Sequence, residues 1–252
     1  MLEELATQAF WIGLLKIIGV NIILSGDNAV VIALAARSLP QRQQKQAVFW
    51  GAGAAVVMRV ILTIFAVALL ALPWLKIVGS LLLFWIGIKL LIPEEGDENI
   101  QASDKLLTAI KTILVADLVM SLDNVIAVAA AAGGSYLLLI LGLAISIPLV
   151  VFGATLLIKL MERWPVIITI GAGLIGWVAG EMLVADLALR PWLEPWGVEY
   201  RGAAPDIRPF VGGVNLEFVC GAIGIVIVVL VGMWLAKRQQ QAQAAEAERP
   251  SS

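Results

Sequence analysis

The chain has 252 residues, of which 61% are hydrophobic and 14% charged, and its formal net charge is −2. Soluble domains are about 45–50% apolar and about 25% charged, so this composition excludes a soluble protein and indicates a polytopic membrane protein. A nucleic-acid-binding protein would show a concentrated basic face, so the charge gives that class no support. The chain has no histidine and one cysteine, Cys220. Any metal site must therefore use oxygen ligands.

The predicted elements are apolar segments long enough to cross about 30 Å of hydrocarbon. We expect them to be helices, because every backbone N–H and C=O must be satisfied within lipid. The N-terminus carries Glu3 and Glu4 rather than basic residues, and the first apolar run is too long for a signal-peptide core, so it is expected to stay as the first span. The seven segments are residues 10–36, 48–71, 74–92, 106–132, 136–160, 165–187 and 211–235.

We predict an all-α membrane protein in which three helices plus three form an inverted repeat, followed by a seventh helix. Gly79, Trp85 and Lys89 of the third span recur 92 positions later as Gly171, Trp177 and Glu181 of the sixth. Because three is odd, the second repeat enters the membrane from the opposite side, as in many secondary transporters whose substrate lies near the midplane. The predicted segments are a first repeat (1–92), an acidic cytoplasmic linker (93–105), a second repeat (106–187), an irregular outer loop (188–210), the seventh helix (211–235) and a cytoplasmic tail (236–252).

The Lys and Arg residues of the loops predict the orientation. Most of them lie on the cytoplasmic side if the N-terminus is outside and the C-terminus inside, which is the arrangement that positively charged loops favour. We expect this topology in a bacterial inner membrane. The tail from Gln239 is rich in Gln, Ala and Glu, and either a fraying helix or disorder fits it.

Two spans carry the same polar pattern, 96 positions apart. The matching residues are Asn21, Ser25, Asp27 and Asn28 in the first span and Asp117, Ser121, Asp123 and Asn124 in the fourth. On a helix the first, second and last members of each set share one stripe, and Asp27 and Asp123 lie about 100° away from it. Both carboxylates could reach one site if the helices are locally unwound, which Gly26 favours in the first span. Leu122 takes that position in the fourth.

An intramembrane carboxylate costs about 2.5–3.5 kcal/mol on insertion scales, so it indicates function unless a cation pairs with it. Arg59 is the candidate partner, and we expect it to be a structural or gating counter-ion rather than a ligand. Two carboxylates with amide and hydroxyl oxygens suit Mn²⁺, Ca²⁺ or Mg²⁺. They could also hold protons when the ion is absent, which is a basis for ion/proton exchange. Lys89 is expected to snorkel, and Glu181 and Glu217 are open candidates for an exit path.

The paired motifs resemble those of the TerC family of integral membrane proteins, most of all its YjbE branch, over roughly residues 10–235. The resemblance implies a membrane protein of metal-ion homeostasis, associated with manganese efflux and tellurium resistance and related to LysE-type exporters. It implies an ion-handling set and leaves the ion open. The motifs are Ser25-Gly26-Asp27-Asn28 and Ser121-Leu122-Asp123-Asn124, and the implied set is Asp27, Asn28, Asp123 and Asn124.

The leading hypothesis is an exporter of a divalent cation, foremost Mn²⁺, that is not an enzyme and holds no tight cofactor. Its expected partners are the lipid bilayer and the metal ion, without nucleic acid, and a homo-oligomer stays open. An amino-acid exporter would need one site for the amine of its substrate and another for the substrate's carboxylate. This chain is rich only in groups that would bind the amine. An intramembrane aspartyl protease would share a proton between two Asp, but Leu24 stands where a Gly-x-Gly-Asp motif needs its first Gly. A structural subunit delivering metal to secreted partners is the remaining alternative.

Overall fold

The computed structural model describes residues 8–24, 26–70, 72–93, 102–132, 135–201 and 208–247. Each of the seven predicted segments is helical in this part of the chain. The first segment holds two helices, on either side of Ser25, which lies outside the described residues. The long helices are α2 (Gln8–Leu24), α3 (Gly26–Ala36), α4 (Gln41–Leu70), α5 (Leu75–Leu91), α6 (Ala102–Ala132), α7 (Tyr136–Arg163), α8 (Val166–Val184) and α10 (Leu216–Ala247).

Four of these helices are long and apolar enough to cross a membrane, counting only the described residues: Gln41–Ile64, Leu137–Arg163, Val166–Val184 and Leu216–Gln243. Helices α3 and α5 have 11 and 17 residues, and α6 carries charged residues along its length. Many large apolar side chains lie on the outside, among them Phe65, Trp85 and Phe152. Such a surface suits contact with lipid rather than water. The chain is therefore a multi-pass membrane protein, and seven spans remain a prediction.

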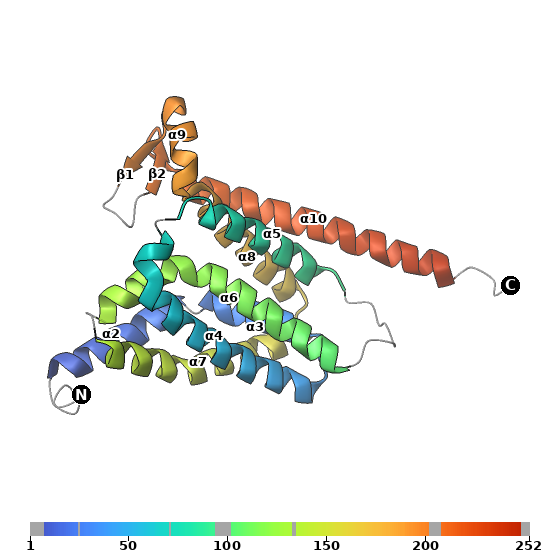
Figure 1. The fold of residues 1–252 in the computed structure, drawn as a ribbon. Coiled ribbons are helices and arrows are strands. Elements are labelled where there is room, and N and C mark those ends of the chain that lie inside the picture. Colours follow the sequence, from blue (N-terminus) through green and yellow to red (C-terminus); the bar gives the residue numbers. More distant parts are fainter. Residues whose placement is uncertain are drawn as a thin grey trace.

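The helices form two groups. Helices α2, α3, α4, α6 and α7 pack together, and α5, α8 and α10 form a second group beside them, as Figure 1 shows. Contacts of α3 with α8 and of α5 with α6 join the groups. The N-terminus and the C-terminus lie at opposite ends of the molecule in Figure 1, and α6 runs opposite to α2 and α3.

The contacts between helices are related by exchange of the first three predicted spans with the next three. Helix α4 packs on α6, and correspondingly α2 and α3 pack on α7. The contact of α3 with α8 likewise corresponds to that of α5 with α6, while α5 packs on α8. These are the contacts that an inverted repeat would produce, and the repeat is carried forward as a proposal.

Where the structure describes it, the segment predicted as an irregular outer loop forms short elements; residues 202–207 lie outside the described part. The short elements are η1 (Leu187–Leu189), α9 (Arg190–Leu193), η2 (Glu194–Trp196), β1 (Glu199–Arg201), β2 (Arg208–Val211) and β3 (Val214–Asn215). The strands form an antiparallel sheet of order β1-β2-β3, with Phe210 opposite both Glu199 and Asn215. Gly212 and Gly213 have φ of 57° and 86°, as a two-residue hairpin turn requires. Apart from this sheet, the described residues form helices and the turns that join them.

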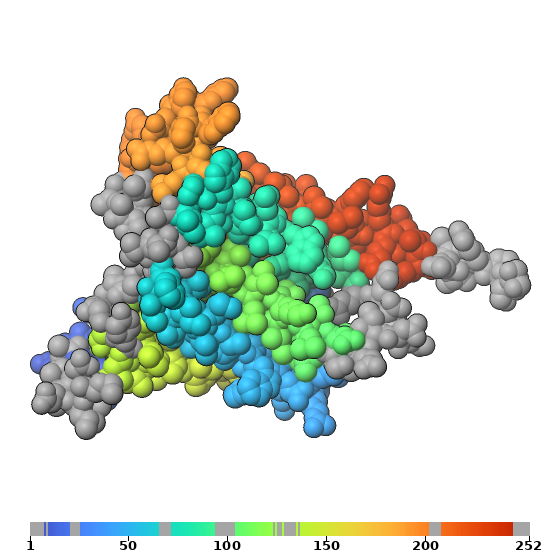
Figure 2. All heavy atoms as spheres, viewed as in Figure 1, coloured from blue at the N-terminus to red at the C-terminus, as the bar shows by residue number. Residues whose placement is uncertain are grey.

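The last helix differs from its prediction at both ends. It begins at Leu216 rather than at residue 211, because β2 and β3 take up the preceding residues. It ends at Ala247, so the described part of the Gln-rich tail is helical. In Figure 2 its last turns extend beyond the packed body of the other helices. On α8, a Cβ at Gly180 would overlap the backbone of Cys220 and Gly221, so the two helices meet backbone to backbone.

Candidate functional site

A buried ion pair joins α4 to α6. The Arg59 Nη2 atom lies 2.7 Å from Asp117 Oδ1, and the Arg59 Nε–H donates to Ser121 Oγ at 3.1 Å. The Ser121 hydroxyl in turn donates to Asp117 Oδ2 at 3.2 Å. Exposure is 4% for Arg59, 5% for Asp117 and 0% for Ser121. The three side chains thus form a closed ring of hydrogen bonds away from solvent, in which both carboxylate oxygens of Asp117 have a partner.

The local structure explains this ring. Asp117 and Ser121 are one helical turn apart on α6, so their side chains lie on the same face. Helix α4 packs against that face and supplies Arg59, whose planar fork reaches the carboxylate and the hydroxyl together. Thr63, one turn further along α4, donates its hydroxyl to the backbone carbonyl of Arg59 at 2.7 Å. That bond lies within α4 and involves only the backbone of Arg59. The Arg59 guanidinium is therefore available to Asp117 and Ser121.

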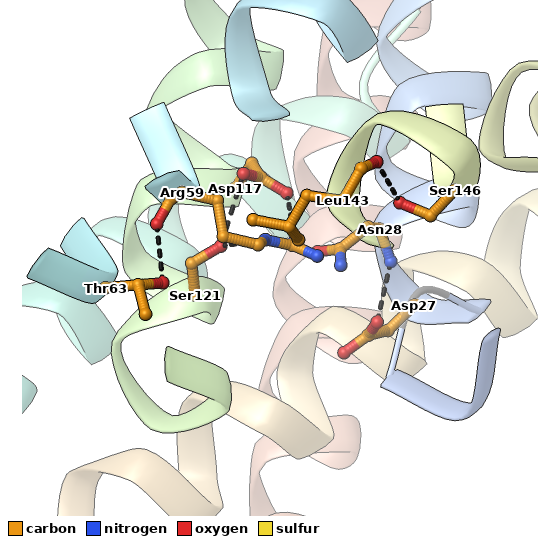
Figure 3. Close-up of polar contacts among 8 residues, drawn as sticks. All are labelled: Asp27, Asn28, Arg59, Thr63, Asp117, Ser121, Leu143 and Ser146. Atoms are coloured by element: carbon orange, nitrogen blue, oxygen red, sulfur yellow. Dashed lines mark hydrogen bonds and ion pairs between the residues drawn. The ribbon is translucent and has the colours of Figure 1, made fainter. Parts of the chain in front are cut away.

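The first copy of the polar pattern reaches the same region from α3. Asp27 lies in the first turn of α3, where its Oδ1 accepts the backbone N–H of Asn28 at 2.8 Å. Carboxylates are favoured there because the N-terminal amides of a helix carry partial positive charge. In Figure 3, Asp27 and Asn28 lie toward the guanidinium end of Arg59, on the side away from Thr63.

The structure thus brings part of the predicted set together. Asp27 and Asn28 from α3 lie on one side of the Arg59 guanidinium, and Asp117 and Ser121 from α6 hold it from the other, with Asn28 only 3% exposed. Asn124 is half-buried on α6. Ser25 lies outside the described residues, as do the side chains of Asn21 and Asp123. Within the described part of the chain, no three carboxylate, histidine or cysteine side chains gather as a metal site would.

Local unwinding was predicted as a way to bring the carboxylates to one site. In the first span the junction of α2 and α3 falls at Ser25, outside the described residues, so unwinding there stays a prediction. Gly26 is itself helical as the first residue of α3, and its φ is not positive. Helix α6 is continuous from Ala102 to Ala132 through the whole second motif. Asp117 and Asp123 therefore remain separated by about 9 Å along the helix axis, at 1.5 Å per residue.

The sequence analysis did not single out four buried polar residues, Thr63, Ser80, Ser146 and Asp186. Ser146 of α7 is 2% exposed, donates to the Leu143 carbonyl at 2.6 Å and appears beside Asn28 in Figure 3. Its only sequence signal is a hydroxyl within an apolar run. Asp186 is also 2% exposed, and its carboxylate accepts the backbone N–H groups of Trp74, Ile77 and Ala188. It ties the start of α5 to the end of α8, which is a structural role.

Fold and site together define a multi-pass integral membrane protein with a charged cluster in its helical core. The chain belongs to the TerC family of integral membrane proteins, whose family model matches residues 6–242.

Relatives occur in Bacillus subtilis (strain 168). The chain is 44% identical over 188 residues to its uncharacterized membrane protein YjbE, covering 75% of this chain and 86% of that protein. It is 28% identical over 202 residues to the uncharacterized membrane protein YkoY, covering 71% of this chain and 61% of that protein. No solved structure matches the chain.

Proposed function

We propose that this protein moves a divalent cation, foremost Mn²⁺, across the membrane, with Ca²⁺ and Mg²⁺ as alternatives. The observation that carries the proposal is the placement of Asp27 on α3 and Asp117 on α6 around the same buried residue, Arg59, in the helical core. Carboxylates without a cationic partner are costly in such a place and mark ion pathways in membrane proteins. Arg59 neutralises Asp117, whereas Asp27 makes no ion pair among the described side chains. One carboxylate comes from each copy of the repeated pattern, as expected for a site between two repeats.

The available ligands set the class of ion. The chain has no histidine, and its one cysteine, Cys220, lies on α10, so carboxylate, amide and hydroxyl oxygens remain. Oxygen ligands suit Mn²⁺, Mg²⁺ and Ca²⁺, and give Cu²⁺ and Zn²⁺ little beyond their general affinity. Protons compete for the same carboxylates, so lower pH weakens cation binding. The proposed ligands are Asn21, Ser25, Asp27, Asn28, Asp117, Ser121, Asp123 and Asn124.

The transport cycle follows from the repeated architecture. We take the chain as seven spans with an inverted repeat, outer N-terminus and inner C-terminus, in the bacterial inner membrane. The contacts that are exchanged between the two sets of helices support this arrangement. Because α6 is a regular helix through Asp117 and Asp123, we propose two half-sites that act in turn as access alternates, with protons as the exchanged ion. The protein is proposed to be a transporter and not an enzyme, and to hold no tight cofactor.

The test is cation flux in proteoliposomes. Purified protein is reconstituted around a fluorescent Mn²⁺ indicator, and uptake is measured for Asp27→Asn and Asp123→Asn, which keep side-chain volume and remove charge. Both are expected to abolish flux while inserting normally. Asp104→Asn is the matched control, because Asp104 is exposed in the first turn of α6 and should leave flux unchanged. Wild-type flux in both variants would reject the assignment.

The same vesicles separate cation export from amino-acid export. An amino acid would need a cation for its carboxylate, and Arg59 is the buried cation among the described residues. Its guanidinium is already held by Asp117 and Ser121. We therefore expect no uptake of radiolabelled lysine or other amino acids, and no inhibition of Mn²⁺ flux by them. Saturable amino-acid uptake would favour the exporter of that class instead.

A further inference from the structure

Asp117 is one of the proposed ligands, and in this structure Arg59 and Ser121 engage both of its oxygens. The Arg59 guanidinium donates to Asp117 Oδ1 at 2.7 Å, and the Ser121 hydroxyl donates to Asp117 Oδ2 at 3.2 Å. Each oxygen keeps a second lone pair, but a cation that binds Asp117 while both partners stay would lie directly beside the Arg59 guanidinium. Since a second positive charge beside Arg59 is opposed by repulsion in a poorly solvated core, the guanidinium is the partner that the cation displaces.

Stability alone is a weak explanation for the pair. Removing two charges from water is expensive, and a buried ion pair can often be replaced by apolar residues without loss of stability. The pair is also absent from the other half of the protein. At the offset of 92 that relates Gly79 to Gly171, Thr63 corresponds to Thr155 and Arg59 to Val151. Thr155 donates to the Val151 carbonyl at 2.7 Å, as Thr63 does to that of Arg59.

We propose that Arg59 is a tethered substitute for the transported cation, an inference that rests on the proposed function. In the cation-free protein its guanidinium neutralises Asp117. A divalent cation binds Asp117 only when Arg59 leaves it, and the return of Arg59 promotes release of the cation. The site thus always holds a positive charge, and Asp117 is never left as an isolated charge in the core. Arg59 is a positioning residue in this scheme and does not bind the cation.

The chemistry of arginine suits this role better than that of lysine. Its guanidinium stays protonated at every pH at which the protein operates, so the substitute charge is not lost when protons compete for the carboxylates. Its fork also donates to Ser121 through Nε, which holds the side chain beside Asp117 in one orientation. The hydrogen bond of Thr63 restrains only the backbone of Arg59, so the long side chain can turn away without unfolding α4.

The test is Mn²⁺ binding to purified Arg59→Ala protein, measured by calorimetry. Binding is expected to tighten by about tenfold or more, because the competing charge beside Asp117 is gone. Added methylguanidinium should then fill the vacated space and reverse the gain in Arg59→Ala, with no effect on wild-type protein at equal ionic strength. Thr63→Ala is the matched control on the same helix, and its affinity for Mn²⁺ should equal that of the wild type.

The outcomes separate this inference from the proposed function. If wild-type protein binds no divalent cation, the proposed function fails. If it binds Mn²⁺ and Arg59→Ala binds no more tightly, with no response to methylguanidinium, the substitute role is overturned and the transport proposal stands. Where Arg59→Ala does not fold, Arg59→Lys carries the test. It keeps a charge but loses the fork, so affinity should rise by a smaller factor, and an unchanged affinity would overturn the inference.

Discussion

The two copies of the polar pattern end in different structural settings. In the first, Asp27 is half-buried in the first turn of the short helix α3 and accepts the N–H of its neighbour Asn28. Among the described side chains it makes no ion pair. In the second, Asp117 lies near the middle of the 31-residue helix α6 and is neutralised by Arg59. Two similar sequence patterns therefore give one carboxylate at a helix end and one within a buried ion pair.

The two settings differ because the two proposed repeats carry different residues at two matching positions. At the 96-position offset Asp117 corresponds to Asn21, so the second copy has an extra carboxylate. At the 92-position offset Arg59 corresponds to Val151, so the first repeat has an extra cation. These two unmatched charges are the ones that pair across α4 and α6. The lesson is that two polar patterns of the same spacing have different partners.

The largest effect should come from breaking the ion pair on one side. Asp117→Leu leaves Arg59 buried and unneutralised, and we expect it to lower the free energy of unfolding by about 3–5 kcal/mol. Asp27→Leu should cost about 1 kcal/mol or less, because it removes one hydrogen bond to a neighbouring amide. Unfolding is followed by tryptophan fluorescence while SDS is titrated into detergent micelles.

The control for that prediction removes both charges. Asp117→Leu combined with Arg59→Met should return stability to within about 1 kcal/mol of the wild type, because apolar side chains can replace a buried pair. Equal losses for Asp117→Leu and Asp27→Leu would mean that the two copies are not electrostatically different, and the comparison would fail.

A smaller effect tests whether the first copy depends on a flexible glycine. Gly26 is helical, and a Cβ built on it meets no atom within 4 Å. Gly26→Ala should therefore stabilise the protein by about 0.4–1 kcal/mol through the unfolded state, and leave Mn²⁺ flux unchanged. The matching position of α6 is occupied by Leu122, so a side chain is compatible with the pattern at this position. Loss of flux in Gly26→Ala would show that transport requires unwinding at this residue.

The sequence predicted the helices well because their limits are set by local chemistry. Long apolar runs are interrupted at Pro73 and at Trp164-Pro165, and α5 and α8 begin just after these positions. It also named Arg59 as the candidate partner of an intramembrane carboxylate, and Arg59 pairs with Asp117; its role as a structural or gating counter-ion stays a prediction. It could not predict which carboxylate pairs with Arg59, because that depends on the packing of α4 against α6 rather than on the pattern of either helix.

Long-range capping and very short strands escaped prediction. Asp186 accepts the N–H of Ile77, 109 residues away, and no local pattern indicates such a contact. Strand β3 has two residues and β1 three, too few to show alternation. The pair Gly212-Gly213 between Val211 and Val214 was the available signal, since glycines at φ above zero are typical of hairpin turns.

The smallest expected change in the free energy of unfolding tests whether the two proposed repeats are alike outside the charged cluster. Thr63 and Thr155 each donate to the carbonyl four residues earlier, at 2.7 Å in both cases. A threonine that bonds back in this way adds little to the stability of a helix and can bend it slightly. Thr63→Val and Thr155→Val should therefore each change the free energy of unfolding by about 0.5 kcal/mol or less, within error of each other. Both are measured by the same SDS titration. A large loss for Thr63→Val alone would show that its hydroxyl supports the ion pair, because only α4 carries Arg59, and the difference between the halves would then extend beyond the charges themselves.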